Sequence, residues 1–277
     1  MRKPTVLITG VSSGFGLASA QLFAARGWNV VATMRDPAAG AALAGPEVVV
    51  ARLDVQDRDS IAAAIDAGIA RFGAIDALVN NAGFGLFGVF ESTPRAKIQE
   101  QFDVNVFGVM DVTRALLPHF RARGAGTIVN VSSGAGVFGL PMISLYNASK
   151  FALEGFSESL SYELRALGIA VRIVEPGGVL DTGFGQRSAQ EATTGAAPPE
   201  AYAGFVAHSA KVFDGLRATR LSTSQEVAEV IFQATTDTGP RLRYVATQDI
   251  VPLLAARRET SEERYMALMR AQFDSAG

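Results

Sequence analysis

Short apolar segments alternate with longer segments of helical periodicity along most of the chain. Residues 4–9 are rich in β-branched and apolar side chains, which is typical of a strand buried on both faces. Similar apolar runs recur at residues 29–34, 47–53, 77–79, 127–131, 170–174 and 243–246. Helical patterns lie between several of them, at residues 17–25, 61–72, 94–117 and 149–167.

This order of elements predicts the fold class. Strands separated by helical segments pair in parallel, with right-handed crossovers that place helices on both faces of the sheet. We therefore expect one α/β domain over residues 1–277, with a doubly wound, mostly parallel, Rossmann-like sheet. Residues 183–199 interrupt the pattern, because they are rich in Gly, Ala, Ser, Thr and Pro. They indicate either a plain surface loop or, given their place after a strand, part of a substrate lid over residues 183–215.

Composition and charge exclude several classes of function. The net charge is −2 and no long basic run occurs, so we expect no nucleic-acid partner. The chain has no Cys and only two His, which excludes disulfides, thiolate catalysis and a Cys- or His-based metal site, although carboxylates could still bind a hard cation; we propose no metal. The apolar run at residues 5–9 is too short for a signal peptide or a membrane span. We expect a soluble, cytoplasmic protein with no membrane partner.

The segment after the first strand has the pattern of a nucleotide-binding loop. Gly10, Gly14 and Gly16 follow a strand and precede a helix, where glycines allow a tight turn and a close backbone approach. The N–H groups at the helix N-terminus can then hold a pyrophosphate. A plain glycine-rich turn is the alternative. Residues 83–88 also match Gly-x-Gly-x-x-Gly, but no helix begins there, so we expect a loop.

Tyr146 and Lys150 form a candidate acid–base pair. Side chains four residues apart on a helix lie on one face. We expect the ammonium to favour the phenolate and to lower the pKa of Tyr146 from about 10 toward the working pH. A Tyr-x-x-x-Lys pattern can arise by chance, so its weight comes from the glycine loop and from Ser133, thirteen residues before the Tyr.

In these motifs the chain resembles the compact branch of the short-chain dehydrogenase/reductase family. The matching segments are Thr9-Gly-x-x-x-Gly-x-Gly16, Leu53-Asp-Val55, Asn80-Asn-Ala-Gly83, Asn105, Ser133, Tyr146-x-x-x-Lys150 and Pro176-Gly177. The resemblance extends from about residue 5 to residue 182, and more faintly to residue 250.

The resemblance implies roles for four catalytic candidates. Tyr146 would exchange a proton with the substrate oxygen, and Lys150 would stabilise the phenolate and bind the nicotinamide ribose. Ser133 would donate to the same oxygen, whereas Ser132 has the wrong spacing to the Tyr. Asn105 would fix a kink in its helix and a water that links Lys150 to solvent. Taken alone, an Asn in a helix is usually a solvated position.

The resemblance also implies a cofactor site. Asp54 and Val55 would line the adenine, although Asp54 alone could be a helix cap. Family members often carry Thr five residues after the Pro of Pro-Gly; here that residue is Asp181, so we expect Thr182 to contact the nicotinamide carboxamide. The expected cofactor contacts are Gly10, Ser12, Ser13, Gly14, Phe15, Gly16, Arg35, Asp54, Val55, Asn81, Tyr146, Lys150, Pro176, Gly177, Val179 and Thr182.

The end of the second strand bears on the choice of cofactor. Met34 lies where NAD-dependent members of the family carry an acid, and Arg35 resembles the NADP-preferring members. Arg35 would face the 2′-phosphate, with Ser13 assisting from the loop. We therefore favour NADP(H) over NAD(H). Asp36 keeps NAD(H) open, because it lies about twenty residues after Gly16, where a generic fingerprint has an acid.

Together these features predict an NADP(H)-dependent oxidoreductase that interconverts a secondary alcohol and a ketone, or an aldehyde. The alternatives are an NAD-dependent dehydrogenase and a dinucleotide-binding sensor without catalysis; the intact Ser133, Tyr146 and Lys150 argue against the sensor. An apolar small-molecule substrate is suggested by Phe138, Leu140, Met142 and Phe184.

The helix predicted at residues 149–167 also bears on assembly. In this family the same helix often packs against its copy in a second subunit, so the resemblance implies a homodimer or homotetramer. The apolar side chains at helical spacing, which in most proteins would belong to the chain's own core, are Phe151, Phe156, Leu160, Leu164 and Leu167.

Overall fold

A seven-stranded sheet lies at the centre of the computed structural model, which describes residues 2–179, 182, 188, 191, 197–217 and 222–274. All its strand pairs are parallel, in the order β3-β2-β1-β4-β5-β6-β7. The strands are β1 (Thr5–Thr9), β2 (Asn29–Met34), β3 (Val48–Arg52), β4 (Ala77–Asn80), β5 (Gly126–Val131), β6 (Ile169–Glu175) and β7 (Arg243–Val245). The predicted doubly wound, Rossmann-like sheet is confirmed.

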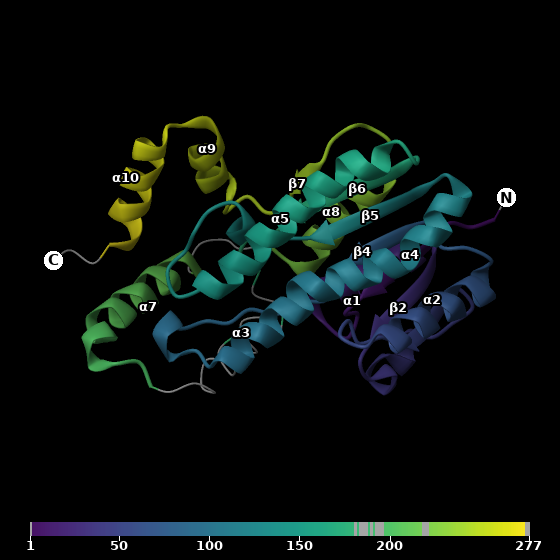
Figure 1. Cartoon of the computed structure of the whole chain (residues 1–277), viewed down its shortest axis with the longest axis horizontal. Helices are drawn as coiled ribbons and strands as arrows, with labels where there is room; N and C mark the ends of the chain where they lie inside the picture. Colours follow the sequence, from purple (N-terminus) through teal and green to yellow (C-terminus); the bar gives the residue numbers. More distant parts are fainter. Residues whose placement is uncertain are drawn as a thin grey trace.

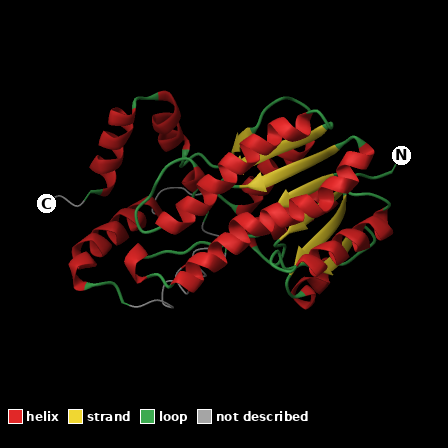
Figure 2. Ribbon diagram, in the orientation of Figure 1, coloured by secondary structure: helices red, strands yellow, loops and turns green. Residues whose placement is uncertain are grey.

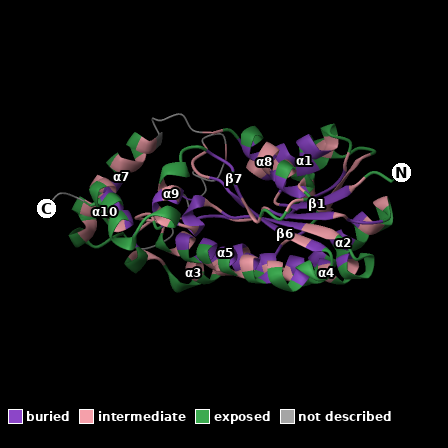
Figure 3. Cartoon of the chain, turned by 90° about the horizontal axis from the view of Figure 1, so that it is seen from above, coloured by how far each residue is buried: buried purple, intermediate pink, exposed green. Residues whose placement is uncertain are grey.

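Helices cover both faces of this sheet, as Figures 2 and 3 show. One layer contains α1 (Gly14–Ala25) and α8 (Ser224–Thr236), and the other contains α2 (Arg58–Phe72), α4 (Val109–Arg123) and α5 (Ser144–Arg165). The remaining helices lie beyond the carboxyl ends of the strands (Figure 1): α3 (Arg95–Phe102), α7 (Ala203–Arg217), α9 (Val251–Glu259) and α10 (Glu262–Phe273). No described helix has the length and apolar character needed to cross a membrane.

Two apolar cores lie on the two faces of the sheet. Successive side chains of a strand point to opposite faces, so β1 contributes to both cores. Val6 and Ile8 belong to the core that contains Phe23 of α1, whereas Leu7 belongs to the core that contains Leu116 of α4. This double burial explains why the strands are continuously apolar instead of alternating.

The segment predicted as one helix at residues 94–117 is interrupted. A π-helical turn, η3 (Asp103–Gly108), separates α3 from α4, and α4 continues through Pro118 to Arg123. A π-turn inserts an extra residue into the helix, and this leaves no clear mark in the apolar periodicity. The loop expected at residues 83–88 is confirmed, because the next helical turn begins at Phe90.

The apolar face predicted to join two subunits is divided between the core and the surface. Leu160 and Leu164 are buried in the chain's own core, and Phe156 packs against that core. By contrast, Phe151 is 43% exposed and Leu167 is 40% exposed. The inner side chains therefore belong to the chain's own core, which is the alternative interpretation of this face, and assembly through the helix stays a prediction.

The region expected to form a substrate lid is described only in part. The turn η5 (Glu200–Tyr202) and helix α7 lie over its second half. Apart from Thr182, Ser188 and Glu191, residues 180–196 lie outside the described residues, and these include Asp181 and Phe184. Helices α8, α9 and α10 were not anticipated from the sequence.

Candidate active site

The predicted site residues lie where the chain leaves the carboxyl ends of the strands. β1 and β4 are neighbours in the sheet, and the crossovers after them lead to opposite sides. The glycine loop follows β1, and residues 81–88 follow β4. Open α/β sheets bind their ligands at such a topological switch point.

Close backbone contacts shape the glycine loop. A Cβ on Gly16 would lie 2.2 Å from the carbonyl oxygen of Gly10, and a Cβ on Gly10 would lie 2.9 Å from Cα of Ala82. Gly10 and Gly14 also have positive φ angles, 72° and 54°, which side chains other than glycine rarely adopt. The loop therefore has no room for larger residues at these positions.

Asn81 joins the glycine loop to the end of β4. Its Nδ2 donates hydrogen bonds to the carbonyl oxygens of Thr9 at 2.9 Å and Gly10 at 3.1 Å. Its N–H donates to Thr9 Oγ1 at 3.0 Å. The side chain expected beside the adenosine ribose thus also holds the glycine loop in place.

The N-terminus of α1 has the features of an anion site. Ser12 and Ser13 are exposed, and Ser13 precedes the helix without donating or accepting a side-chain hydrogen bond at the cap. Phe15 packs its ring against the core. Thr182 Cγ2 would lie 3.4 Å from a Cβ on Gly14, so Thr182 adjoins the loop. First-turn N–H groups lack partners within a helix, and together with the helix dipole they fit the pyrophosphate of a dinucleotide.

The residues after β2 differ in what their side chains do. Arg35 is exposed and makes no hydrogen bond or ion pair with any described residue. Asp36 caps the turn η1 (Pro37–Leu43) by accepting a hydrogen bond from the N–H of Ala38 at 3.0 Å. Met34 is 3% exposed and packs against Gly40, where a Cβ would lie 2.3 Å from Met34 Cε. Of the three, Arg35 is exposed and makes no interaction with described residues, whereas Asp36 is exposed with one oxygen used at the cap and Met34 is buried.

The pair expected to line the adenine follows β3. Val55 is buried and packs against Gly108. A Cβ added to Gly108 would lie 2.7 Å from the Cβ of Val55. Asp54 accepts a hydrogen bond from the N–H of Gln56 at 3.1 Å. The alternative role of Asp54 as a helix cap is wrong, because Asp57 caps α2.

Asn105 lies in the π-turn η3, and its side chain is buried. Its Nδ2 donates to the carbonyl oxygen of Phe84 at 2.8 Å and to Ser149 Oγ at 3.1 Å, and its Oδ1 accepts from the N–H of Phe84 at 3.0 Å. It is 1% exposed, so the alternative of a solvated helix position is wrong. Asn105 therefore connects the loop after β4 with α5.

Lys150 adjoins Asn105. Its Nζ donates to the carbonyl oxygen of Val131 at 2.9 Å and lies 5.7 Å from the ring centroid of Tyr146. A Cβ on Gly83 would lie 3.2 Å from Asn105 Oδ1 and 3.8 Å from Lys150 Nζ. The absence of a side chain at Gly83 thus allows these groups to lie close together.

Ser133 occupies the turn after β5. Its Oγ accepts a hydrogen bond from the N–H of Ala135 at 3.1 Å and lies 3.4 Å from the carbonyl oxygen of Pro176. It also hydrogen-bonds to Tyr146. The structure therefore brings Ser133, Tyr146 and Lys150 together from β5 and α5.

The surroundings of the pair shift both titrating groups. Burial raises the pKa of Tyr146 to about 12, although the hydrogen bond from Ser133 acts in the opposite direction. Burial lowers the pKa of Lys150 to about 8, against the attraction of Glu154. The prediction that Lys150 lowers the pKa of Tyr146 is wrong for this structure, because burial of the phenol dominates.

Asn147 is one polar residue whose role the sequence reasoning missed. Its Nδ2 donates to the carbonyl oxygens of Ala135 at 2.7 Å and Phe138 at 2.8 Å. It fixes the start of α5 to the turn after Ser133. Its position next to Tyr146 was the only available signal.

Thr247 and Asp249, after β7, were also missed. Thr247 Oγ1 accepts a hydrogen bond from the N–H of Gly177 at 2.8 Å, and Asp249 Oδ2 accepts from that of Gly178 at 2.7 Å. They hold the segment that continues to Val179, which pairs with Ser222 in an isolated bridge. Only their place after a strand end could have indicated this role.

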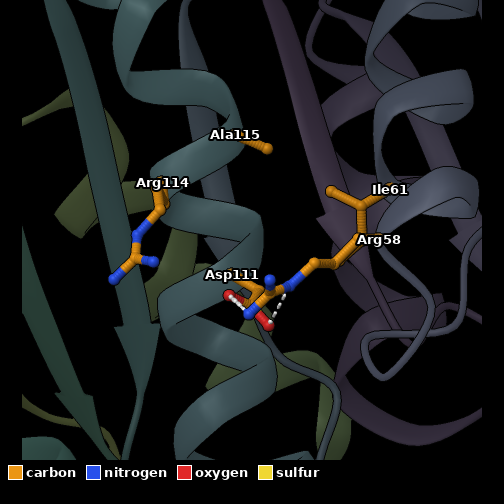
Figure 4. A pocket seen from close by; sticks show the side chains of 5 residues that line it. All are labelled: Arg58, Ile61, Asp111, Arg114 and Ala115. Carbon is orange, nitrogen blue, oxygen red and sulfur yellow. Dashed lines mark hydrogen bonds and ion pairs between the residues drawn. The ribbon is translucent and has the colours of Figure 1, made fainter.

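A separate pocket lies between α2 and α4 (Figure 4). Arg58 makes two hydrogen bonds with Asp111 there, at 3.1 and 3.2 Å. The pocket is lined by Arg58, Ile61, Asp111, Arg114 and Ala115 and includes none of the predicted site residues. We therefore place the candidate active site at the strand ends.

Known proteins resemble this chain over most of its length. Residues 4–193 match a family model described as short chain dehydrogenase. Bovine (Bos taurus) retinol dehydrogenase 8 is 37% identical over 91% of this chain and 84% of its own length. Human (Homo sapiens) 17-beta-hydroxysteroid dehydrogenase type 1 is 36% identical over 98% of this chain and 86% of its own length.

Solved structures also share the fold. A short-chain dehydrogenase from Streptomyces avermitilis has a TM-score of 0.80 and 32% identity, covering 98% of this chain and 94% of that one. A short chain dehydrogenase/reductase from Burkholderia phymatum, in complex with NAD, has a TM-score of 0.80 and 28% identity, covering 100% and 98%.

Proposed function

Because the chain belongs to the short-chain dehydrogenase family, we propose that it interconverts a secondary alcohol and a ketone, or an aldehyde, with Tyr146 as acid and base. Family membership makes it an NAD(P)-dependent oxidoreductase that acts on CH–OH groups. The observation that carries the finer proposal is the proximity of Ser133, Tyr146 and Lys150 at the topological switch point, beside the glycine loop.

In the reducing direction, Tyr146 donates its proton to the carbonyl oxygen of the substrate while Ser133 hydrogen-bonds to the same oxygen. The pKa of Tyr146, raised to about 12, supports this role, because the group is a neutral phenol at neutral pH. The ammonium of Lys150 stabilises the phenolate that remains. The nicotinamide, when bound, supplies the hydride. Asn105 connects the loop after β4 to Ser149, the residue before Lys150 on α5.

NADP(H) is the cofactor that we propose. Arg35 supports it, since its exposed guanidinium is available to a 2′-phosphate while Asp36 uses one oxygen at the cap of η1. Met34 supports it as well, because an acid there would have to be buried. NAD(H) is the second candidate, favoured by the NAD that the Burkholderia phymatum relative binds.

An apolar alcohol or carbonyl compound is the substrate class that we propose. Phe138 is buried in an apolar cluster with Ile250 of the segment after β7, and Leu140 packs against that cluster. The names of two relatives, a retinol dehydrogenase and a hydroxysteroid dehydrogenase, denote apolar alcohols for those proteins. The described half of the lid region, α7, contributes Val212 and Leu216 to the same cluster.

Assembly through α5 and its neighbour η3 is a further part of the proposal. Their large exposed apolar side chains are Phe107, Phe151 and Tyr162, and Leu167 lies just after the end of α5. Surfaces of this kind are usually covered by a partner, and a second copy of the chain is the partner that we propose. Sedimentation at micromolar concentration would show a dimer or tetramer, and a clean monomer would contradict it.

The absorbance of reduced nicotinamide tests the function directly. We expect oxidation of NADPH, faster than that of NADH, with at least one ketone or aldehyde of an apolar panel. Titration of NADPH binding by fluorescence serves as the control that the protein is folded. Tight binding without turnover on any member of the panel would favour the dinucleotide-binding sensor.

A further inference from the structure

A cluster of buried charges begins one helical turn after Lys150. Glu154 follows Lys150 by four residues on α5, so the two side chains share a face of the helix. The Glu154 side chain is 8% exposed, and its Oε2 accepts a hydrogen bond from Arg243 Nε at 3.0 Å. Its Oε1 is buried and meets no partner at full hydrogen-bond geometry among the described residues.

Arg243, on β7, connects Glu154 to two more carboxylates. Its second nitrogen donates to Glu158 at 2.5 Å, and its Nε lies 3.5 Å from Oε1 of Glu175, which is fully buried at the end of β6. Arg258 of α9 binds both oxygens of Glu175, at 2.6 and 3.2 Å. The cluster therefore ties α5 to β6, β7 and α9, and it ends directly before Pro176.

The two buried carboxylates of this cluster, Glu154 and Glu175, face two guanidinium groups, and a third carboxylate, Glu158, is 44% exposed. The guanidinium groups are those of Arg243 and Arg258. Buried charges are tolerated when each is compensated. When the exposed Glu158 is counted, the ammonium of Lys150 gives the cluster three charges of each sign.

Neutral groups otherwise surround Lys150. Val131 of β5 accepts a hydrogen bond from Lys150 Nζ. The neutral amide of Asn105, which binds Ser149 and Phe84, lies on the same side of Gly83. On its own helix, Tyr146 is a phenol on one side and Glu154 a carboxyl group on the other. Glu154 is therefore the one negative group among the neighbours described.

Packing fixes Glu154 where it is. A Cβ on Gly136 would lie 2.9 Å from Glu154 Cγ and 2.8 Å from Ser132 Oγ, so the turn after β5 rests directly on this side chain. The Ser132 hydroxyl faces the carboxyl group and lowers its pKa, although the two do not reach full hydrogen-bond geometry. Burial and the nearby Glu175 act in the opposite direction and raise the pKa of Glu154 overall.

We propose that Glu154 is a positioning residue for proton transfer: its carboxylate, held by Arg243, keeps Lys150 in the ammonium form beside Tyr146. The proposal rests on the proposed function, because it assumes that charged Lys150 is the active form. Burial moves the pKa of Lys150 downward, Glu154 is the charge that opposes this shift, and the two together leave the pKa at about 8. Without Glu154 the ammonium would lose its proton nearer to neutral pH.

The titration of Lys150 can be followed directly, since the chain has only four lysines: Lys3, Lys97, Lys150 and Lys211. We suggest ¹³C NMR of lysine labelled at Cε, with the Lys150→Arg variant identifying the resonance. In Glu154→Gln the midpoint of Lys150 should fall by about one pH unit or more. Glu158→Gln is the matched control, because Glu158 also binds Arg243 but its side chain is 44% exposed, and it should move the midpoint much less.

Turnover provides the second readout. In the reducing direction, kcat/KM should fall at high pH as Lys150 loses its proton, and Glu154→Gln should move this alkaline limb to lower pH by the same amount as the NMR midpoint. Glu154→Asp retains the charge and should restore both values at least in part. If Glu154→Gln does not fold, Glu154→Met replaces it, since it removes the charge at similar volume, and the midpoint of Lys150 should again fall.

Three outcomes would overturn the proposal. An unchanged Lys150 midpoint in Glu154→Gln would show that Glu154 does not hold the charge. A lowered midpoint with an unmoved alkaline limb would show that the charge is held but not used in proton transfer. An equal shift of the Lys150 midpoint in Glu158→Gln would mean that the summed charge of the cluster sets the protonation of Lys150, and that Glu154 has no special role. Absence of turnover in the unmodified protein would instead reject the proposed function, and the NMR midpoint would still decide whether Glu154 and Lys150 are coupled.

Discussion

The glycine loop and the first half of α5 lie at the same edge of the sheet, but different interactions hold them. In the loop the close contacts are between backbone atoms, such as the 2.2 Å that would separate a Cβ on Gly16 from the carbonyl oxygen of Gly10. In α5 the contacts are hydrogen bonds and charges of buried side chains, such as Lys150 with Val131 and Glu154 with Arg243. The loop cannot accept added volume, whereas α5 cannot lose a polar group without leaving another unpaired.

This difference teaches how the two halves of the site respond to substitution. A side chain added to the loop should weaken cofactor binding and leave the chemistry of bound substrate largely intact. A polar group removed from α5 should change rate and pH dependence, and it should change affinity only where, as at Lys150, the group is also expected to contact the ribose. The substitutions below test that division, beginning with the largest expected effect.

Tyr146→Phe should reduce turnover by about 10²- to 10⁴-fold, because the ring remains and only the proton donor is lost. NADPH affinity should stay within a few-fold of the unmodified value. Steady-state kinetics and fluorescence titration measure the two quantities. Tyr162→Phe is the control on the same helix, since Tyr162 is 72% exposed, and it should change neither. Near-normal turnover in Tyr146→Phe would show that the proton comes from another group.

Lys150→Met should lower activity and raise stability. The pKa of Lys150 in the folded chain, about 8, lies below its ordinary value of 10.5, so the unfolded chain binds the proton more tightly. The free energy of unfolding of the unmodified protein should therefore rise with pH between about 8 and 10.5, and below that window burial of the ammonium costs up to about 3 kcal/mol.

Urea unfolding at pH 7 should then show Lys150→Met to be about 1–3 kcal/mol more stable than the unmodified protein, with the difference shrinking toward pH 10.5. Lys211→Met, at an exposed position of α7, should leave stability nearly unchanged. A less stable Lys150→Met at pH 7 would mean that the hydrogen bond to Val131 outweighs the cost of burial.

Arg35→Ala tests the side-chain part of the cofactor site. Loss of one charge-assisted contact costs about 1.5–3 kcal/mol, a weakening of NADPH binding by about 10- to 150-fold. NADH lacks the phosphate, so its affinity should change little, and the ratio of the two dissociation constants is the quantity to measure. Arg52→Ala is the control, because Arg52 ends the neighbouring strand and binds Asp57. Equal losses for both cofactors would indicate stacking on the adenine.

Gly16→Ala should weaken both cofactors together. Forcing a methyl group into closely packed atoms costs about 1–3 kcal/mol, or about 5- to 150-fold in affinity where the strain falls on the binding loop. Gly155→Ala is the control, since no atom lies within 4 Å of the added methyl group and α5 should gain helix propensity. Normal affinity in Gly16→Ala would show that the loop can shift, and that the proposed division between shape and charge is wrong.

Much of the fold could be predicted from the sequence because a parallel sheet leaves a strong local signal. Strands buried on both faces must be continuously apolar, and all seven were located within a few residues. The helices after residue 200 were missed although α7 carries apolar side chains along its length and α8 begins at a capping box formed by Thr223 and Glu226. A kink at Asn105 was expected, but the π-helical turn that forms it was not, because one extra residue hardly alters the periodicity of a long helix.

The sequence by itself determined which segments form strands. It also determined that Gly16 lies on a loop before a helix, that Ser133 follows a strand, and that Tyr146 and Lys150 lie one helical turn apart, because short-range spacing along the chain sets these features. Only the tertiary structure decided the charge environment of the site. Glu154 and Arg243 are separated by 89 residues, and their pairing depends on how β7 docks beside β6. The pKa of Tyr146 was predicted in the wrong direction for the same reason, since burial is a property of the packed chain and not of a spacing along it.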